Sequence, residues 1–127
     1  MAKVDLVDKK ISMDKSEIIR FQIMTHCYIH GISITDSDLE CLTLLGTEES
    51  FEQSEFFKLA IEKGIFKTPQ TVRNSLRKAR EYNLISKEGD WKKVVFLNPN
   101  LGIKTKGNIL LNYKILHIEA RPLGHSN

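Results

Sequence analysis

The sequence predicts an α+β fold that is mostly helical. Apolar residues recur at helical spacing in four segments between residues 16 and 82. Two short runs that each contain apolar residues, 84–87 and 94–97, then flank a turn sequence, and one more alternating apolar run lies near the end. A length of 127 residues and a hydrophobic content of 41% are typical of one globular domain, so we expect a single domain over 1–127.

The first expected helix belongs to an N-terminal helical part, residues 15–53. It follows Ser16, and Gly31 supplies a natural stop. The apolar residues that recur at helical spacing are Ile19, Ile23 and Cys27. The run is rich in β-branched residues, so a strand is the competing interpretation. Before it, residues 10–13 are compatible with a short strand.

The second expected helix begins after Thr35, whose hydroxyl suits a helix cap. Asp36 and Asp38 then fall in the first turn, where the helix dipole favours acidic side chains. The buried stripe comprises Leu39, Leu42 and Leu45. Gly46 is expected to end this helix, and the acidic stretch after it, TEESFEQ, is expected to form a loop or a frayed helix start.

Residues 54–82 predict two further helices joined by a short turn. The third helix starts at Ser54, and Gly64 supplies its stop. Thr68 caps the fourth, and Pro69 occupies the first helical position, where its missing N–H is harmless. The core face of the fourth helix comprises Val72, Leu76 and Ala79.

A β-hairpin is predicted over 84–97. Its strands are 84–87 and 94–97, and Gly89-Asp90 marks the turn between them. Residues 98–127 form a C-terminal extension. Apolar residues alternate from 109 to 118, which favours an extra strand, with a helix as the alternative.

The run from residue 54 to 97 resembles the winged helix-turn-helix family. The matching letters are EFFKLAIEKGIFKTPQTVRNSLRKAREYNLISKEGDWKKVVFLNP. Asn83 stands where that family commonly has Gly before Leu-Ile, and Asn tolerates a left-handed backbone. The resemblance implies that the helix at 69–82 enters the major groove of duplex DNA and that the hairpin is a wing.

The side chains expected to contact DNA lie on this helix and on the wing. Gln70, Asn74 and Arg77 suit base edges, whereas Thr and basic side chains suit phosphates. The full set is Thr68, Gln70, Thr71, Arg73, Asn74, Arg77, Lys78, Lys87, Lys92 and Lys93. An ordinary solvated helix face is the alternative. Trp91, at the expected tip, either stacks on a sugar or packs on the core or another protein, and we favour the latter.

Charge is unevenly distributed along the chain. Residues 1–64 carry a net −5 and residues 65–127 a net +8, which suggests a polyanionic partner. Residues 36–62 carry −7 and residues 67–80 carry +5, so copies could also stack head to tail, and we expect a homo-oligomer.

A weaker resemblance covers the whole chain. The segments TDSDLECLTLLG, GIFKTPQTVRNSLRKAREYNLISKEG and GNILLNYKIL resemble small proteins of crAss-like tailed phages. This resemblance implies either a phage regulator or replication protein that binds DNA, or a virion component such as a head-to-tail connector or ring protein.

No pattern in the sequence points to catalysis. His26 and His30 lie four apart and could begin a zinc site, but no third ligand has a recognisable spacing. We therefore expect a non-enzymatic protein with no cofactor, no metal and no membrane partner. The two cysteines, Cys27 and Cys41, form no disulfide or metal motif, so we expect a reducing bacterial cytoplasm, or the virion if the phage alternative holds.

Overall fold

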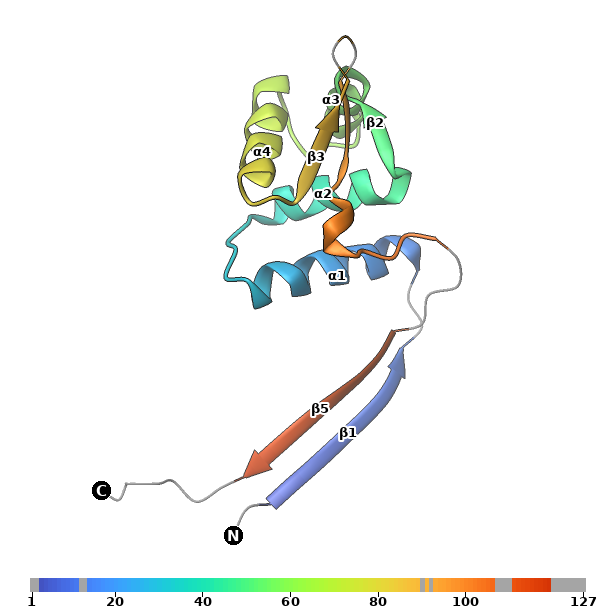
Figure 1. The fold of residues 1–127 in the computed structure, drawn as a ribbon, viewed down its shortest axis with the longest axis vertical. Helices are drawn as coiled ribbons and strands as arrows, with labels where there is room; N and C mark the ends of the chain where they lie inside the picture. The colour runs from blue at the N-terminus through green and yellow to red at the C-terminus, as the bar shows by residue number, and fades with distance from the viewer. Residues whose placement is uncertain (1–2, 12–13, 90, 92, 107–110, 120–127) are drawn as a thin grey trace, which may run out of the picture. The chain divides into compact units, whose positions relative to one another are not determined.

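The computed structural model describes residues 3–11, 14–89, 91, 93–106 and 111–119 (Figure 1). It confirms the predicted α+β class, with four helices and a three-stranded antiparallel sheet among the described residues. The sequence predicts one domain, whereas the chain divides into two compact units. The division arises because the strands from the two ends of the chain pair with each other and not with the three-stranded sheet.

The smaller unit is a two-stranded antiparallel ribbon. It pairs β1 (Lys3–Ile11) with β5 (Leu111–Glu119), from Lys3 opposite Glu119 to Ile11 opposite Leu111. The favoured strand over 109–118 is therefore confirmed from Leu111 onward, and 109–110 lie outside the described residues. The short strand at 10–13 is part of a longer one that begins at Lys3, while 12–13 lie outside the described residues.

The larger unit begins with α1 (Lys15–Ile29), which is the predicted helix and not a strand. Its cap is Asp14, two residues before Ser16, where the sequence predicts the start of the helix. An Asp14 carboxylate oxygen accepts from the Glu17 N–H at 2.8 Å, and the Glu17 carboxylate accepts from the Asp14 N–H at 3.2 Å. This reciprocal capping box starts the helix despite its β-branched residues.

Helix α2 (Asp36–Glu48) starts at Thr35 as predicted but does not end at Gly46. A Cβ atom at Gly46 would lie 2.7 Å from Leu97 Cδ1 and 2.8 Å from Ile19 Cγ2. Gly46 therefore lets neighbouring elements approach the helix closely, and the helix ends at Glu48, followed by the cap residue Glu49, whose φ is 74°. Gly46 therefore allows close packing and does not stop the helix.

Strand β2 (Ser50–Glu52) replaces the loop that was expected over TEESFEQ. It pairs antiparallel with β4 (Val94–Leu97), which also pairs with β3 (Ile85–Glu88), so the sheet order is β2–β4–β3. The loop prediction was wrong because a three-residue strand gains its stability from the strand beside it, about 40 residues away in sequence.

Helices α3 (Gln53–Glu62) and α4 (Pro69–Glu81) match the predicted pair closely. The predicted core face of α4 is confirmed, because Val72, Leu76 and Ala79 are all buried. They join one cluster of buried residues from the helices and the sheet. Its largest members that are fully buried include Phe56, Ile19, Ile23, Leu42, Leu45 and Leu84.

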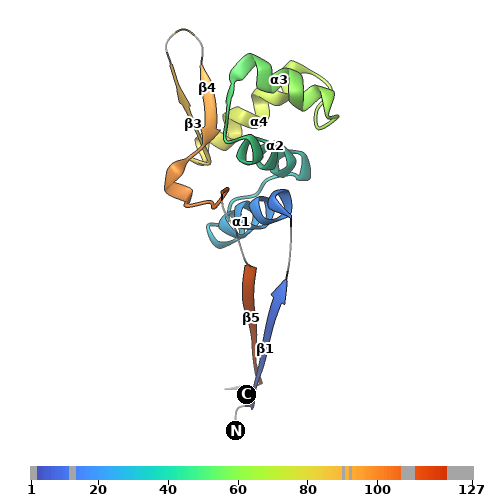
Figure 2. The same cartoon turned by 90° about the vertical axis from the view of Figure 1, so that its right-hand side faces the viewer.

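The hairpin β3–β4 leaves the end of α4 through a tight turn at Asn83, whose φ of 59° is left-handed as expected. The Asn98 side-chain amide donates to the Asn83 carbonyl at 2.9 Å, and the Asn98 N–H donates to the Leu84 carbonyl at 3.0 Å. A short 3-10 helix, η1 (Pro99–Leu101), follows. In Figures 1 and 2 the hairpin stands beside α4 and projects from its base, an order compatible with a winged helix-turn-helix.

Candidate nucleic-acid interface

The outward face of α4 carries a network of polar side chains. Gln70 Nε2 donates to Asn74 Oδ1 at 2.9 Å, and Arg77 donates to the same Asn74 oxygen. Arg73 Nη1 donates to Gln70 Oε1, also at 2.9 Å, and all four groups are exposed. These contacts hold the expected base-reading side chains in one row along the helix, which reduces the entropy lost when a ligand binds.

Arg73 also contacts the neighbouring helix. Its guanidinium carbon lies 5.5 Å from the centre of the Phe57 ring on α3, within the range of a cation–π interaction. Arg73 therefore links α3 to α4 while keeping donors on the surface.

Lys78, predicted as a phosphate contact, lies in a different environment. Its Nζ is 2.9 Å from Asp38 Oδ2 on α2, and its side chain is only 37% exposed. Asp38 also accepts from the Ser75 hydroxyl at 2.7 Å, so one α2 carboxylate binds two α4 side chains. The Lys78 charge is balanced within the fold.

Burial alone would raise the pKa of the Asp38 carboxyl. Hydrogen bonds from Lys78, Thr35 and Ser75 outweigh that effect, so the pKa lies below its ordinary value and the group is ionised at neutral pH. Burial also raises the pKa of the nearby Cys41 thiol to about 12, which leaves it a protonated core residue rather than a nucleophile.

Thr68 and Thr71, also predicted as phosphate contacts, are exposed at the start of α4. The Thr68 hydroxyl accepts from the Thr71 N–H at 3.2 Å, and the Thr71 hydroxyl donates to the Thr68 carbonyl at 2.7 Å. Both hydroxyls are used in capping the helix. Their main effect is therefore on where α4 begins.

The hairpin adds cations beside those of α4. Lys87 is half-buried on β3, Lys93 is exposed just before β4, and Lys92 lies outside the described residues. The pKa of Lys87 is lowered by burial first and then by the positive charges of Arg80, Lys93 and Arg73. These charges therefore lie close enough to repel one another.

Arg80 is the cation that the sequence-based site omitted. It follows Arg73 and Arg77 at helical spacing, which could have placed it on the same side of α4. Its proximity to the hairpin was not visible, because that depends on how the hairpin packs. We call the cationic surface over α4 and the hairpin the basic face; its members are Arg73, Arg77, Arg80, Lys87 and Lys93.

Trp91 lies in the turn between β3 and β4 and is 92% exposed. Packing on the chain's own core, one of the alternatives favoured from the sequence, is therefore wrong. The apolar surface of α1 is the other place where large apolar side chains are strongly exposed among the described residues. Tyr28 is 87% and Ile29 is 69% exposed there, with Met24 beside them at 42%.

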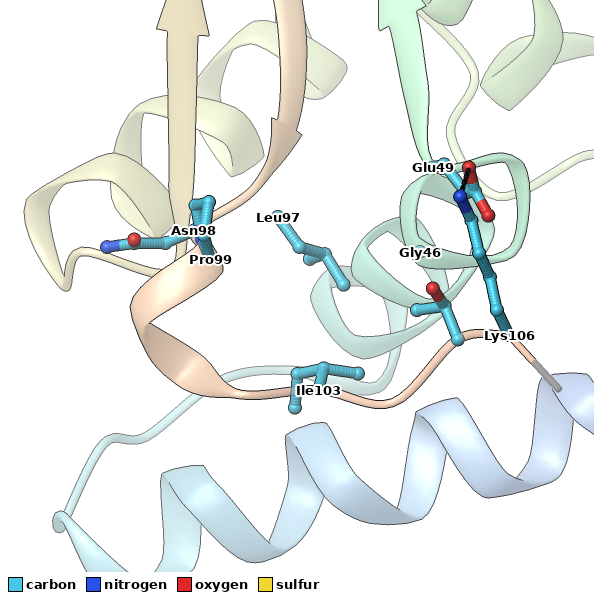
Figure 3. A pocket seen from close by; sticks show the side chains of 8 residues that line it. Gly46, Glu49, Leu97, Asn98, Pro99, Ile103 and Lys106 are labelled. Atoms are coloured by element: carbon cyan, nitrogen blue, oxygen red, sulfur yellow. Dashed lines mark ion pairs between the residues drawn. The ribbon is translucent and has the colours of Figure 1, made fainter. Parts of the chain in front are cut away.

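A hollow of about 190 Å³ lies between α2 and the segment after β4. Figure 3 shows Leu97, Pro99 and Ile103 along it, with Glu49 and Lys106 together at one side. The Lys106 Nζ lies 3.5 Å from a Glu49 carboxylate oxygen. Since these opposite charges are paired, the hollow offers no net charge to an ionic ligand.

The two histidines expected on one helix face do lie together, with ring centres 4.3 Å apart for His26 and His30. Burial and the charge of His30 lower the pKa of His26. No group of three or more His, Cys, Asp or Glu that could hold a metal occurs among the described residues. Within that same part of the chain, every helix is too short or too polar to cross a membrane.

Comparison with known proteins gives no relative: no family model, no curated protein and no solved structure matches this chain.

Proposed function

We propose that this protein binds duplex DNA without catalysing a reaction, as a regulator or a replication-associated protein, and that it is phage-encoded. The observation that carries the proposal is the basic face, where cations from α4, β3 and the start of β4 gather on one side of the larger unit. Contacts between these cations and phosphates would release counterions from the DNA, which is a large source of affinity.

In this proposal α4 lies in the major groove. The amides of Gln70 and Asn74 suit adenine edges, and the Arg77 guanidinium suits guanine. Arg80, Lys87 and Lys93 contact the phosphates that flank the groove. The three side chains that meet base edges supply sequence specificity. The three that meet phosphates position the protein on the duplex and supply affinity.

Salt dependence tests the proposal directly. If Arg73, Arg80, Lys87 and Lys93 each meet one phosphate, affinity for a duplex falls about 150-fold between about 50 and about 200 mM salt. Fluorescence anisotropy with a labelled 20-base-pair duplex measures this slope. Affinity that is weak at low salt, or independent of salt, would refute the proposal.

A second candidate function is assembly between protein copies, as in a virion connector or ring. The observation that favours it is the apolar surface of α1 formed by Met24, Tyr28 and Ile29, since patches of this kind commonly mark protein contacts. In this case the basic face would meet the acidic surface of α2 and α3 on the next copy.

Light scattering distinguishes this candidate. It predicts an oligomer at low salt that Tyr28→Asp or Glu55→Lys dissociates, with the helical content unchanged. Glu55 is the better acid to reverse, because Glu52 caps α3 by accepting from the Ser54 and Glu55 N–H groups at 3.4 Å. A monomer at high protein concentration and low salt would exclude assembly of this kind.

A further inference from the structure

Trp91 is exposed at the far end of a well-anchored hairpin. Both strands that carry it pack on the core, because Ile85 of β3, Val95 of β4 and Leu84 just before β3 are buried. It is the chain's one tryptophan, and 92% of its surface is open to solvent. An anchored hairpin therefore presents a flat aromatic group that its own subunit does not cover.

The charges near this indole are mostly positive. Lys93 is two residues away and exposed, and Lys87 lies four residues before it on the paired strand. Arg80 and Arg73, on α4, lie within electrostatic range of Lys87. A cationic surface beside an exposed aromatic ring is the combination that holds nucleic-acid strands, because phosphates meet the cations while bases stack on the ring.

Within an intact duplex, the faces of the bases are already stacked on one another. Inserting an indole between them would cost a few kcal/mol of unstacking. A base that is already unpaired offers its face without this cost. An exposed indole next to a duplex-binding surface therefore gains most from DNA in which duplex and single strand adjoin.

We propose that Trp91 stacks on an unpaired nucleobase, so that the ligand of this protein is duplex DNA carrying a single-stranded end. This inference rests on the proposed DNA-binding function and specifies its ligand. A protein pocket as the partner of Trp91 is the competing explanation, and the cations of the basic face favour DNA over it.

The test uses the full chain and four DNAs: a blunt duplex, the same duplex with a four-nucleotide overhang, the same overhang made of abasic residues, and the overhang strand alone. The abasic overhang keeps the phosphates but removes the base faces. We expect the normal overhang to bind at least about fivefold more tightly than the blunt and abasic forms. Since Trp91 is the one tryptophan, its fluorescence should be quenched by that DNA alone among the three duplexes.

Variants complete the test. Trp91→Ala should abolish the preference for the overhang, and Trp91→Phe should keep most of it. Tyr28→Ala is the matched control, because it removes another strongly exposed aromatic ring, on α1, and should leave the preference unchanged. None of the three replaces a buried residue, so folding should be retained.

Each other outcome has a definite meaning. Equal affinity for all three duplexes with no loss in Trp91→Ala overturns the inference and leaves duplex binding intact. No binding to any DNA overturns the proposed function as well. Fluorescence that changes with protein concentration, but not with DNA, assigns Trp91 to a protein contact and overturns the inference.

Discussion

Replacing Arg77, Arg80 and Lys93 with alanine together should weaken duplex DNA binding by about 100- to 1,000-fold at low salt. The three cations lie on α4 and beside β4, and all are exposed, so the fold should be unaffected. Each substitution removes one charge-assisted contact to the DNA, and each such contact changes the affinity roughly tenfold. Anisotropy titration measures the loss, and the salt slope should fall by about two, because Arg80 and Lys93 are the two of these side chains that contact phosphates in the proposal.

The choice of residues matters for this experiment. Arg73 stacks on Phe57 and Lys78 pairs with Asp38, so their removal would disturb the fold as well as any interface. The control is the triple change Lys58→Ala, Lys63→Ala and Lys104→Ala, which removes the same charge from exposed positions outside the basic face. If the control weakens binding as much as the test variant, binding depends on net charge and the assigned face is wrong.

Replacing Asp38 with alanine should lower the free energy of unfolding by about 2–3 kcal/mol. The carboxylate accepts hydrogen bonds from Ser75 and Lys78 on α4 and from the Thr35 N–H at the start of α2. Its loss leaves the Ser75 hydroxyl and the half-buried Lys78 ammonium without that partner. The figure stays near the lower end for buried pairs because Lys78 is 37% exposed.

Urea and thermal denaturation followed by circular dichroism measure this change. Asp36→Ala is the matched control, since it removes an exposed acid from the same first turn of α2 and should cost no more than about 1 kcal/mol. Equal losses for the two variants would mean that only the helix-terminal charge matters. The contacts of Asp38 with α4 would then contribute nothing measurable.

The same carboxylate gives the stability a defined pH dependence. Since the pKa of Asp38 is lower in the folded than in the unfolded chain, ionised Asp38 stabilises the fold above its unfolded pKa of about 3.8. That contribution is lost as the pH falls through the folded-state pKa. The difference in stability between wild type and Asp38→Asn should therefore be full at pH 7 and shrink below about pH 4.

Much of the fold could be predicted because its signals are local. The caps of α2 and α4 follow from Thr35 and Thr68, and the buried face of α4 follows from residues three and four apart. The left-handed turn at Asn83 followed from the residue type. Such features depend on neighbours within one helical turn, which sequence patterns record directly.

The features that were missed depend on distant partners. Strand β2 exists because β4 pairs with it, and Gly46 is required by Leu97 and Ile19, neither of which is near in sequence. The same holds for the site. The sequence alone shows no partner for the Lys78 charge, because Asp38 lies 40 residues earlier and only the fold brings α2 against α4. A single sequence contains no record of these contacts.

Asn98, which follows β4, donates hydrogen bonds to the carbonyls of Asn83 and Leu84, which precede β3. The two ends of the hairpin are therefore joined immediately after α4 ends. These hydrogen bonds fix the base of the hairpin next to the end of α4. The spacing between α4 and the hairpin is therefore set before a ligand binds. A ligand that contacts both α4 and the hairpin must have dimensions that fit this fixed spacing. In the proposed complex, a DNA duplex that is bent, overwound or underwound would therefore bind more weakly because of its shape, whatever its base sequence.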